Sequence, residues 1–517
     1  MHDSQGTSNS TIRRGSPQGG GWRELIEGPG EEHYSTIPHG VPLACLWHLS
    51  DLHLCDAESP ARQEYLDRHA DPDSPYRQEL GDVGTYRPQE ILTAQVAVAM
   101  VQTVNSHLRG PLTGAGVDGV VITGDLTDNA QGNELHWYQQ IVTGGVVSPR
   151  SGDPDRSSWV GSAQAPWDER YWHPDGPPAQ ESADLPTRCY GYPVIPGLVE
   201  VARRDLHSPG LAVPWISVPG NHDGLLQGTV PVDDRLQALA TGGERVTDLP
   251  VGMDPRLTGE AIPGTGPARY LDDETSPRTQ IPADPGRALL RPGEFAARTR
   301  SAVGAPDYFS TDLGALRIIV LDTVNPHGGW QGSIDEDQRA WLIKELDLAS
   351  DRYVVIASHH PSPSMTNDWA PPGVGSRVLG PEVVDLLLEH RQVIAWLAGH
   401  IHAHGVIVHE RDGHAFVELT TASLIDWPQQ GRILEFVRTD DATGPCIAIV
   451  STVMNHLAPI DWRGGDLTDH RRLASISRVL AANDYQLRDG SIRSLVLESI
   501  PQARNNVWLV PDPHPTG

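Results

Sequence analysis

Five short clusters of Asp, His and Asn residues occur along the chain, and these side chains are common metal ligands. Each cluster follows a short apolar run; the clusters are Asp51-Leu52-His53, Gly124-Asp125, Gly220-Asn221-His222-Asp223, His359-His360-Pro361 and Gly399-His400-Ile401-His402. In an extended segment, residues i and i+2 face the same side, so the Asp-x-His and His-x-His pairs can each direct two donors to one place. Ionisable groups buried at so many strand ends would carry a large desolvation cost unless a cation compensated for it. Together, the clusters predict a metal centre.

The donors in these clusters are nitrogen and oxygen atoms, without a thiolate. Such a set suits Mn, Fe, Zn, Co or Ni and leaves the choice among them open. The four cysteines, Cys45, Cys55, Cys189 and Cys446, are scattered and form no CxxC pair. This spacing argues against a zinc knuckle and a disulfide framework, and it fits a reduced, intracellular setting.

The apolar runs before the clusters have the length and β-branched content of buried strands. With one further run they cover residues 43–49, 117–122, 213–218, 316–321, 353–357 and 393–398. Helical spacing predicts helices between them, over 88–108, after Asp335 and from Pro381. Strands that alternate with helices predict an α/β architecture. After residue 403, further runs at 406–409, 416–420 and 433–437 predict a second, antiparallel group of strands.

Two stretches, about 145–212 and 224–305, are rich in Pro, Gly, Asp and Ser and show no clear alternation of strands and helices. We expect them to be long loop insertions rather than separate domains. Because the candidate ligands span residues 51–402 and must converge, we predict one catalytic domain, 39–460, that contains both. Residues 1–38 are expected to form a flexible lead-in. Residues 461–517 are expected to form a C-terminal extension with one helix near 471–482, followed by polar sequence.

The chain carries a formal net charge of −28, and Lys344 is the only lysine among its 39 basic residues. Negative charge repels phosphate backbones and anionic lipids, so we expect neither nucleic acid nor a membrane as a partner. No apolar run is long enough for a transmembrane helix. Arg13-Arg14 is followed by glycine-rich sequence where a secretory signal needs an apolar segment, so we expect a cytoplasmic protein. The sequence does not indicate the oligomeric state.

As a set, the order Asp-x-His, Gly-Asp, Gly-Asn-His-Asp, His and Gly-His-x-His resembles the calcineurin-like metallophosphoesterase superfamily. The resemblance covers residues 43–405, interrupted by the two insertions. Three more blocks resemble a family of large actinobacterial metallophosphoesterases: Ser59-Pro60-Ala61-Arg62, Tyr86-Arg87-Pro88-Gln89-Glu90 and Asp426-Trp427-Pro428-Gln429. The resemblance implies a four-layer αββα sandwich, in which two sheets are flanked by helices and two metal ions lie at the strand ends.

Carried over residue by residue, the resemblance implies a ligand set for two divalent metal ions. The first ion would be held by Asp51, His53, Asp125 and His402. Asp125 would bridge to the second ion, which Asn221, His359 and His400 would complete.

Further roles are implied for residues beside the ligands. His222 would donate a proton to the leaving oxygen or stabilise it. Asp223 would orient the His222 ring or, alternatively, cap a helix. Asn129 and His360 would contact substrate phosphate or serve as structural groups. Asp128 stands where purple acid phosphatases have a tyrosine, which argues against an iron–tyrosinate site.

Two metal ions about 3.5–4 Å apart acidify a bridging water and hold the attacking and leaving oxygens of an in-line displacement at phosphorus. We therefore predict a dimetal hydrolase of small phosphoesters, with diesters of the cyclic nucleotide or glycerophosphodiester type favoured. The alternatives are a phosphomonoesterase or nucleotidase, a nuclease, which the net charge disfavours, and a non-catalytic scaffold. The scaffold is disfavoured because all seven ligands and His222 are present.

Overall fold

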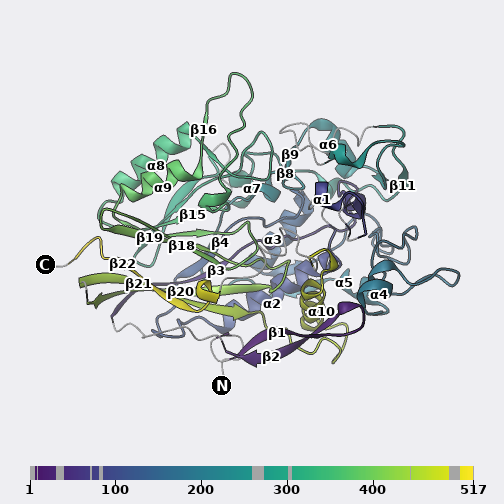
Figure 1. The fold of residues 1–517 in the computed structure, drawn as a ribbon, viewed down its shortest axis with the longest axis horizontal. Helices are drawn as coiled ribbons and strands as arrows, with labels where there is room; N and C mark the ends of the chain where they lie inside the picture. Colours follow the sequence, from purple (N-terminus) through teal and green to yellow (C-terminus); the bar gives the residue numbers. More distant parts are fainter. Residues whose placement is uncertain are drawn as a thin grey trace.

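Two six-stranded sheets form the centre of the molecule (Figure 1). The computed structural model describes residues 6–7, 10–30, 40–69, 71, 73–80, 86–258, 273–300, 306–442, 444–487 and 501–515. The first sheet has the order β22 (Asn506–Pro511), β21 (Gly444–Asn455), β20 (Gln430–Asp441), β3 (Val41–Leu49), β4 (Gly119–Ile122), β7 (Trp215–Ser217). The second has the order β12 (Phe309–Leu313), β13 (Leu316–Val320), β15 (Tyr353–Ala357), β17 (Val393–Ala398), β19 (His414–Thr420), β18 (Gly405–Arg411).

The two sheets pack face to face and each is covered by helices on its outer face. Successive residues of a strand point to opposite faces, so Leu46 contributes to the core between the sheets while Trp47 packs against the helices of the first sheet. These helices are α2 (Thr93–Ser106), α3 (Gly132–Thr143) and α10 (His470–Ala482). The second sheet is covered by α8 (Glu336–Leu348) and α9 (Gly380–Leu388), which Figure 1 shows above the sheets. The predicted αββα sandwich is confirmed.

The sequence signals for the flanking helices are confirmed as well. Asp335 caps α8, because its side chain accepts a hydrogen bond from the Gln338 backbone N–H at 2.8 Å. Pro381 lies in the first turn of α9, where its missing N–H costs no hydrogen bond.

The sequence predicted a separate antiparallel group of strands after residue 403, and this prediction is wrong. β19 pairs in parallel with β17, and β18 adds to it antiparallel at the edge of the second sheet. β20 pairs antiparallel with β3 and β21, which places it inside the first sheet. The apolar runs were therefore read correctly as strands, but they belong to two different sheets, and β20 pairs with β3, which lies far away in the sequence.

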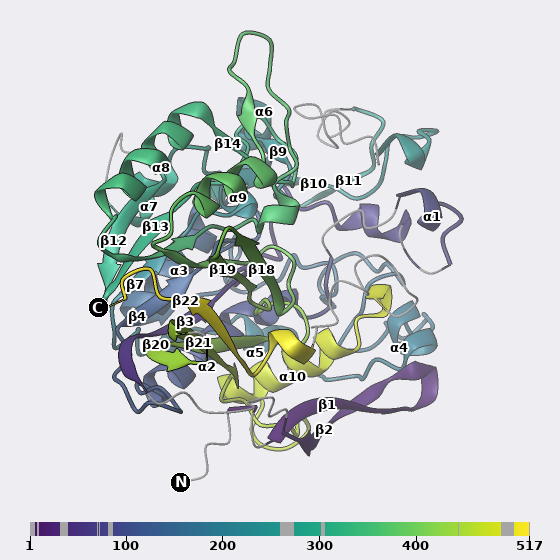
Figure 2. The ribbon, with the colours of Figure 1, turned by 60° about the vertical axis from the view of Figure 1, so that its left-hand side comes forward.

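The two ends of the chain are more ordered than we expected. Residues 10–29, predicted to be part of a flexible lead-in, form a hairpin of β1 (Ser10–Pro17) and β2 (Arg23–Pro29). The Trp22 ring at its turn is buried against Trp462 and Tyr192, which explains why a polar segment is held in place (Figure 2 shows the hairpin beside α10). At the other end, β22 extends the first sheet where only polar sequence was expected. Residues 31–39 of the lead-in lie outside the described residues.

Where the structure describes them, segments 145–212 and 224–305 carry only short elements. The first contains β5 (Gly145–Val147), α4 (Leu185–Tyr190), α5 (Leu198–Ala202) and β6 (Leu206–Ser208). The second contains β8 (Leu225–Leu226), β9 (Val230–Pro231), α6 (Asp234–Thr241), β10 (Glu244–Val246), β11 (Arg278–Gln280) and α7 (Phe295–Thr299). The remaining short elements are α1 (Arg77–Leu80), β14 (Ile334–Asp335) and β16 (Arg377–Val378). In the part of the chain that the structure describes, every helix is too short or too polar to span a bilayer.

Candidate metal centre

Four of the predicted ligands converge at the ends of β3, β4 and β17. Asp51, His53, Asp125 and His402 each offer one ligand atom, and these atoms all lie within 4.8 Å of one another. The His53 Nε2 atom lies 3.2 Å from His402 Nε2 and 3.4 Å from Asp125 Oδ2, and His402 Nε2 lies 3.4 Å from Asp51 Oδ1. Ligand atoms that share one cation at bonds of about 2.1 Å lie about 3.0–3.4 Å apart. The spacing of this group therefore fits one metal ion.

A second group adjoins the first through Asp125. Asp125 Oδ2 lies 3.2 Å from His359 Nε2, and His400 Nδ1 lies 3.3 Å from the same nitrogen. One carboxylate oxygen thus faces histidines from two groups, which is the arrangement that a bridging ligand needs.

Asn221 supplies a further donor that fits a cation. Its Nδ2 donates to the Gly228 carbonyl at 3.0 Å, whereas its Oδ1 is buried and has no hydrogen-bond partner among the described residues. An amide oxygen buried without a donor is costly. A metal ion at this oxygen would remove that cost, so the seven predicted ligands fit the two metal ions they are expected to hold.

Five of the candidate ligands have a strained backbone. Asp51, His53, Asp125, His400 and His402 all have φ between 44° and 70°, the left-handed region that side chains with a Cβ rarely adopt. Strain of this kind costs of order 1–3 kcal/mol per residue and clusters at functional sites, where the surrounding structure holds it. The turns at these strand ends are shaped to direct side chains to one point rather than to minimise local energy.

The ring orientation of three histidines is fixed by acceptors at Nδ1. His53 Nδ1 lies 3.0 Å from Asp128 Oδ1, His402 Nδ1 lies 2.7 Å from Asp426 Oδ2, and His359 Nδ1 lies 2.8 Å from the Thr123 carbonyl. Each acceptor favours the tautomer with the proton on Nδ1, which leaves a lone pair on Nε2 for a metal ion.

Two buried arginines hold the carboxylates behind these histidines. Arg62 donates to Asp128, and its other guanidinium nitrogen lies 2.7 Å from Glu90 Oε2. Arg87 Nε donates to Asp426 Oδ1 at 2.8 Å. Burial alone would raise the pKa of Asp128, but Arg62 and the His53 hydrogen bond hold it well below the usual value. Asp128 is therefore an ionised partner for His53.

These supporting residues were not assigned a role from the sequence. Arg62, Arg87, Glu90 and Asp426 all lie in the three blocks that carry the actinobacterial resemblance, and that resemblance was the only signal that could have pointed to them. Asp128 was noticed only as the residue that replaces a tyrosine.

His222 lies beside both groups, as predicted. Its backbone N–H donates to Asp125 Oδ1 at 2.9 Å, its ring centroid is 4.6 Å from that of His53, and its Nδ1 lies 2.5 Å from the Asp128 carbonyl oxygen. Its Nε2 faces Gly228, where a Cβ atom would come within 2.5 Å of it, so only glycine fits there. Burial lowers the pKa of His222 to about 4, against the opposing effect of Asp125.

Asp223 does not orient the His222 ring. Its Oδ1 accepts from the Thr127 backbone N–H and its Oδ2 from the Gly220 backbone N–H, both at 2.9 Å. Asp223 is the third residue of the short helix Asn221–Asp223, and its bond to the Gly220 N–H is part of a capping box. The N-cap position considered for it as the alternative is held by Gly220. The Asp128 carbonyl takes the orienting role instead.

The two residues predicted to contact substrate differ from each other. His360 is fully buried, with Nδ1 2.8 Å from Thr323 Oγ1 and Nε2 3.1 Å from the Trp330 carbonyl, so both ring nitrogens have partners within the chain, which favours the structural role considered as the alternative. Asn129 Oδ1 accepts from the Gln227 backbone N–H, but its Nδ2 is buried and has no partner among the described residues. That donor stays available, and its contact with substrate stays a prediction.

Comparison with known proteins supports this interpretation of the site. Residues 184–404 match the model of the calcineurin-like phosphoesterase family. The matched residues include Asn221, His359, His400 and His402, whereas Asp51, His53 and Asp125 lie before them and join the site only in the folded chain.

One curated relative and several solved structures are also similar. A 92-residue stretch is 34% identical to the 3′,5′-cyclic adenosine monophosphate phosphodiesterase CpdA of Pseudomonas aeruginosa; the alignment covers 18% of this chain and 32% of that protein. The chain thus spans about a third of that relative's length. A dimetal phosphatase from Danio rerio is 13% identical with a TM-score of 0.32, covering 80% of this chain and 97% of the other. GAP50, an anchor in the inner membrane complex of Plasmodium, is 11% identical with a TM-score of 0.26; the alignment covers 79% of this chain and 84% of GAP50.

The Asp426 carboxylate gives a prediction about metal affinity. Asp426→Asn keeps the shape of the side chain but removes the charge that polarises His402, so we expect metal affinity to fall about 10–100-fold. Competition with a chromophoric chelator measures this change. Asp440→Asn, at the exposed end of β20, is the control and should bind metal like the wild type. Equal affinities for both variants would contradict the role of Asp426.

Proposed function

We propose that this protein is a dimetal-dependent hydrolase of small phosphoric esters. The observation that carries the proposal is the position of Asp125 Oδ2, which lies within 3.4 Å of a histidine of each group. Metal ions held there would supply positive charge for the phosphate oxygens and lower the pKa of a water molecule for attack on phosphorus in line with the leaving group.

The side chains of this protein would hold and support those ions. Asp51, His53, Asp125 and His402 would bind one, and Asn221, His359, His400 and the shared Asp125 the other. Asp128 and Asp426 would keep two of the histidines in the tautomer that binds metal, and Arg62 and Arg87 would keep those carboxylates ionised.

His222 would act on the leaving oxygen. With Nδ1 directed to the Asp128 carbonyl, Nε2 is the ring atom free to meet the substrate. The negative charge of a bound ester beside this ring favours its protonated form. The leaving alkoxide would then depart as an alcohol, because His222 would provide the proton.

The surroundings favour a diester that carries a planar ring, such as a cyclic nucleotide. The Trp330 ring is half-exposed and stacks on the His400 ring, with centroids 5.9 Å apart and an interplanar angle of 25°. Its loop is anchored by hydrogen bonds from Gly329 N–H to the Thr229 carbonyl and from Asn367 Nδ2 to the Gly328 carbonyl, both 2.8 Å. A fixed, exposed indole beside a metal ligand is a surface on which a nucleobase can stack. The Pseudomonas relative, named as a phosphodiesterase of 3′,5′-cyclic adenosine monophosphate, agrees with this substrate class.

The test is a screen of p-nitrophenyl mono- and diesters, cyclic nucleotides and glycerophosphodiesters with metal-free protein and added Mn, Fe, Zn, Co or Ni. We expect diester hydrolysis that depends on added metal. Predominant monoester hydrolysis would favour the phosphomonoesterase or nucleotidase alternative. No hydrolysis with any metal would favour the scaffold. We also propose that the chain is related to the large actinobacterial metallophosphoesterases, because it shares with them the three sequence blocks that contain Arg62, Arg87 and Asp426.

Trp330 provides a specific prediction within this screen. Trp330→Ala should raise KM for a cyclic nucleotide about tenfold, because stacking of a base on an aromatic ring contributes about 1–3 kcal/mol. KM for a glycerophosphodiester, which has no ring, should change little. Trp369→Ala, another exposed tryptophan, is the matched control. Equal effects of Trp330→Ala on both substrates would contradict the stacking role.

A further inference from the structure

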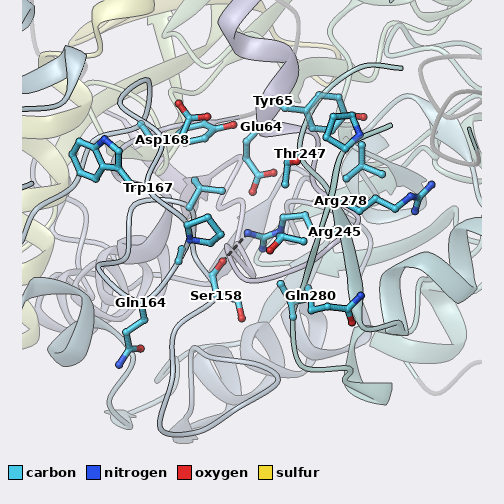
Figure 3. A pocket seen from close by; sticks show the side chains of 18 of the residues that line it. Glu64, Tyr65, Ser158, Gln164, Trp167, Asp168, Arg245, Thr247, Arg278 and Gln280 are labelled. Carbon is cyan, nitrogen blue, oxygen red and sulfur yellow. Dashed lines mark hydrogen bonds between the residues drawn. The ribbon is translucent and has the colours of Figure 1, made fainter. Parts of the chain in front are cut away.

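A cavity of about 630 Å³ lies between segments 145–212 and 224–305 and the residues around Glu64 (Figure 3). None of the eleven residues predicted from the sequence as ligands, catalytic residues or substrate contacts at the metal centre is among those that line it. Its volume is in the range of sites for small molecules. We propose that this cavity binds a small organic anion with a planar ring, of the size of a mononucleotide. This inference does not depend on the proposed hydrolase activity.

The central cation of the cavity is Arg245, which is 3% exposed. Its guanidinium donates to main-chain carbonyls, at 2.7 Å to Ser158 and 3.1 Å to Ser59. Among the described residues no carboxylate lies within 4.0 Å of it, and its buried Nε has no hydrogen-bond partner. A buried guanidinium without a counter-charge is costly. A phosphate or carboxylate group in the cavity would provide that charge.

Three of the carboxylates that line the cavity pair with arginines other than Arg245. Asp168 and Asp248 both pair with Arg68, at 2.9 and 3.1 Å, and Glu64 pairs with Arg62 at 3.2 Å. These acids therefore already have their own arginine partners. The anion that Arg245 can still accept must come from outside the described chain.

Aromatic side chains form the walls on either side of Arg245. Figure 3 shows Trp167 and Tyr65 on opposite sides of the cavity, with Arg245 between them. Trp167 is held in place by its contact with the His173 ring, with centroids 4.2 Å apart. Aromatic rings beside an arginine match a ligand that carries a flat ring and an anionic group, because the ring can stack while the anion meets the guanidinium.

Isothermal titration calorimetry with the full metal-loaded chain tests this proposal, with AMP as probe and adenosine and inorganic phosphate as comparisons. We expect one AMP per chain at this site, with adenosine and phosphate each bound at least about tenfold more weakly because each lacks one of the two contacts. The Asp125→Asn variant should still bind AMP here, even though its metal centre is impaired. If Asp125→Asn abolishes AMP binding, the nucleotide was held by the metal centre and the proposal is wrong.

Two variants test the contacts separately. Arg245→Gln should weaken AMP binding at least about tenfold, and Trp167→Ala should weaken AMP and adenosine but not phosphate. Arg204→Gln, which removes an exposed arginine paired with Glu200, is the matched control and should bind AMP normally. Thermal unfolding of each variant shows whether it is folded. If Arg245→Gln does not fold, Trp167→Ala still tests the proposal. Wild-type affinity in both folded variants, or no AMP binding by the wild type at millimolar concentration, would overturn the proposal.

Discussion

Asp125→Asn should lower bound metal from about two ions per chain to fewer than one and reduce turnover by about 10³-fold, which corresponds to about 4 kcal/mol of lost charge stabilisation. The geometry explains why so small a change has so large an effect. The Asp125 Oδ1 atom accepts from the His222 backbone N–H, while Oδ2 faces the Nε2 atoms of His53 and His359. An asparagine that keeps the first hydrogen bond turns its NH2 group toward both histidines. It would then donate to the lone pairs that should bind metal.

Elemental analysis of the purified variant measures this outcome together with its turnover. The matched control is Asp118→Asn, just before β4 at the opposite end of the sheet, where the carboxylate accepts from the Cys45 backbone N–H. This control should keep its metal. If Asp125→Asn retains two ions per chain, Asp125 is not the bridge.

His222→Ala should show the complementary behaviour, with about two ions per chain but turnover of an alkyl ester reduced by about 10²–10⁴-fold. The ring is not among the predicted ligands, so its removal should leave the metal ions in place. A p-nitrophenolate leaving group needs little protonation, so its hydrolysis should be reduced much less than that of an alkyl ester.

This dependence on the leaving group distinguishes a proton donor from a residue that only shapes the site. Asp223→Asn is a useful comparison, because Asp223 closes the adjacent helix without contacting the His222 ring. Asp223→Asn should change the turnover of the alkyl ester and of the p-nitrophenyl ester by the same factor. Equal losses for both esters in His222→Ala would contradict the proton-donor role.

The local spacing of residues was enough to predict which ones converge. The Asp51–His53 and His400–His402 pairs do reach the site. Their left-handed φ angles show that sharp turns direct these side chains, rather than the extended alternation on which the prediction was based. The strands and the α/β architecture followed from apolar runs that end at these clusters, whereas the αββα layers were implied by the family resemblance. Both features depend on residues that are close together in the sequence.

What the sequence did not reveal depends on pairs that are far apart. His53 meets Asp128 75 positions away, and Arg87 meets Asp426 339 positions away. No periodicity links such residues, because their contact exists only after the sheets have packed. The Asp223 role was missed for a related reason: its sequence position allows both a cap and a partner for His222, and only the folded backbone decides between them.

The order of strands in the first sheet has a consequence for synthesis on the ribosome. β3, which precedes the first two ligands, lies between β4 and β20, so one of its edges stays open until residues 430–441 have left the exit tunnel. His402 and its partner Asp426 also emerge late. At about 5–20 residues per second, the nascent chain spends tens of seconds with this hydrophobic edge uncovered. The complete set of ligands is therefore available to metal ions only late in synthesis, and chaperones that shield strand edges should matter for the yield of active protein.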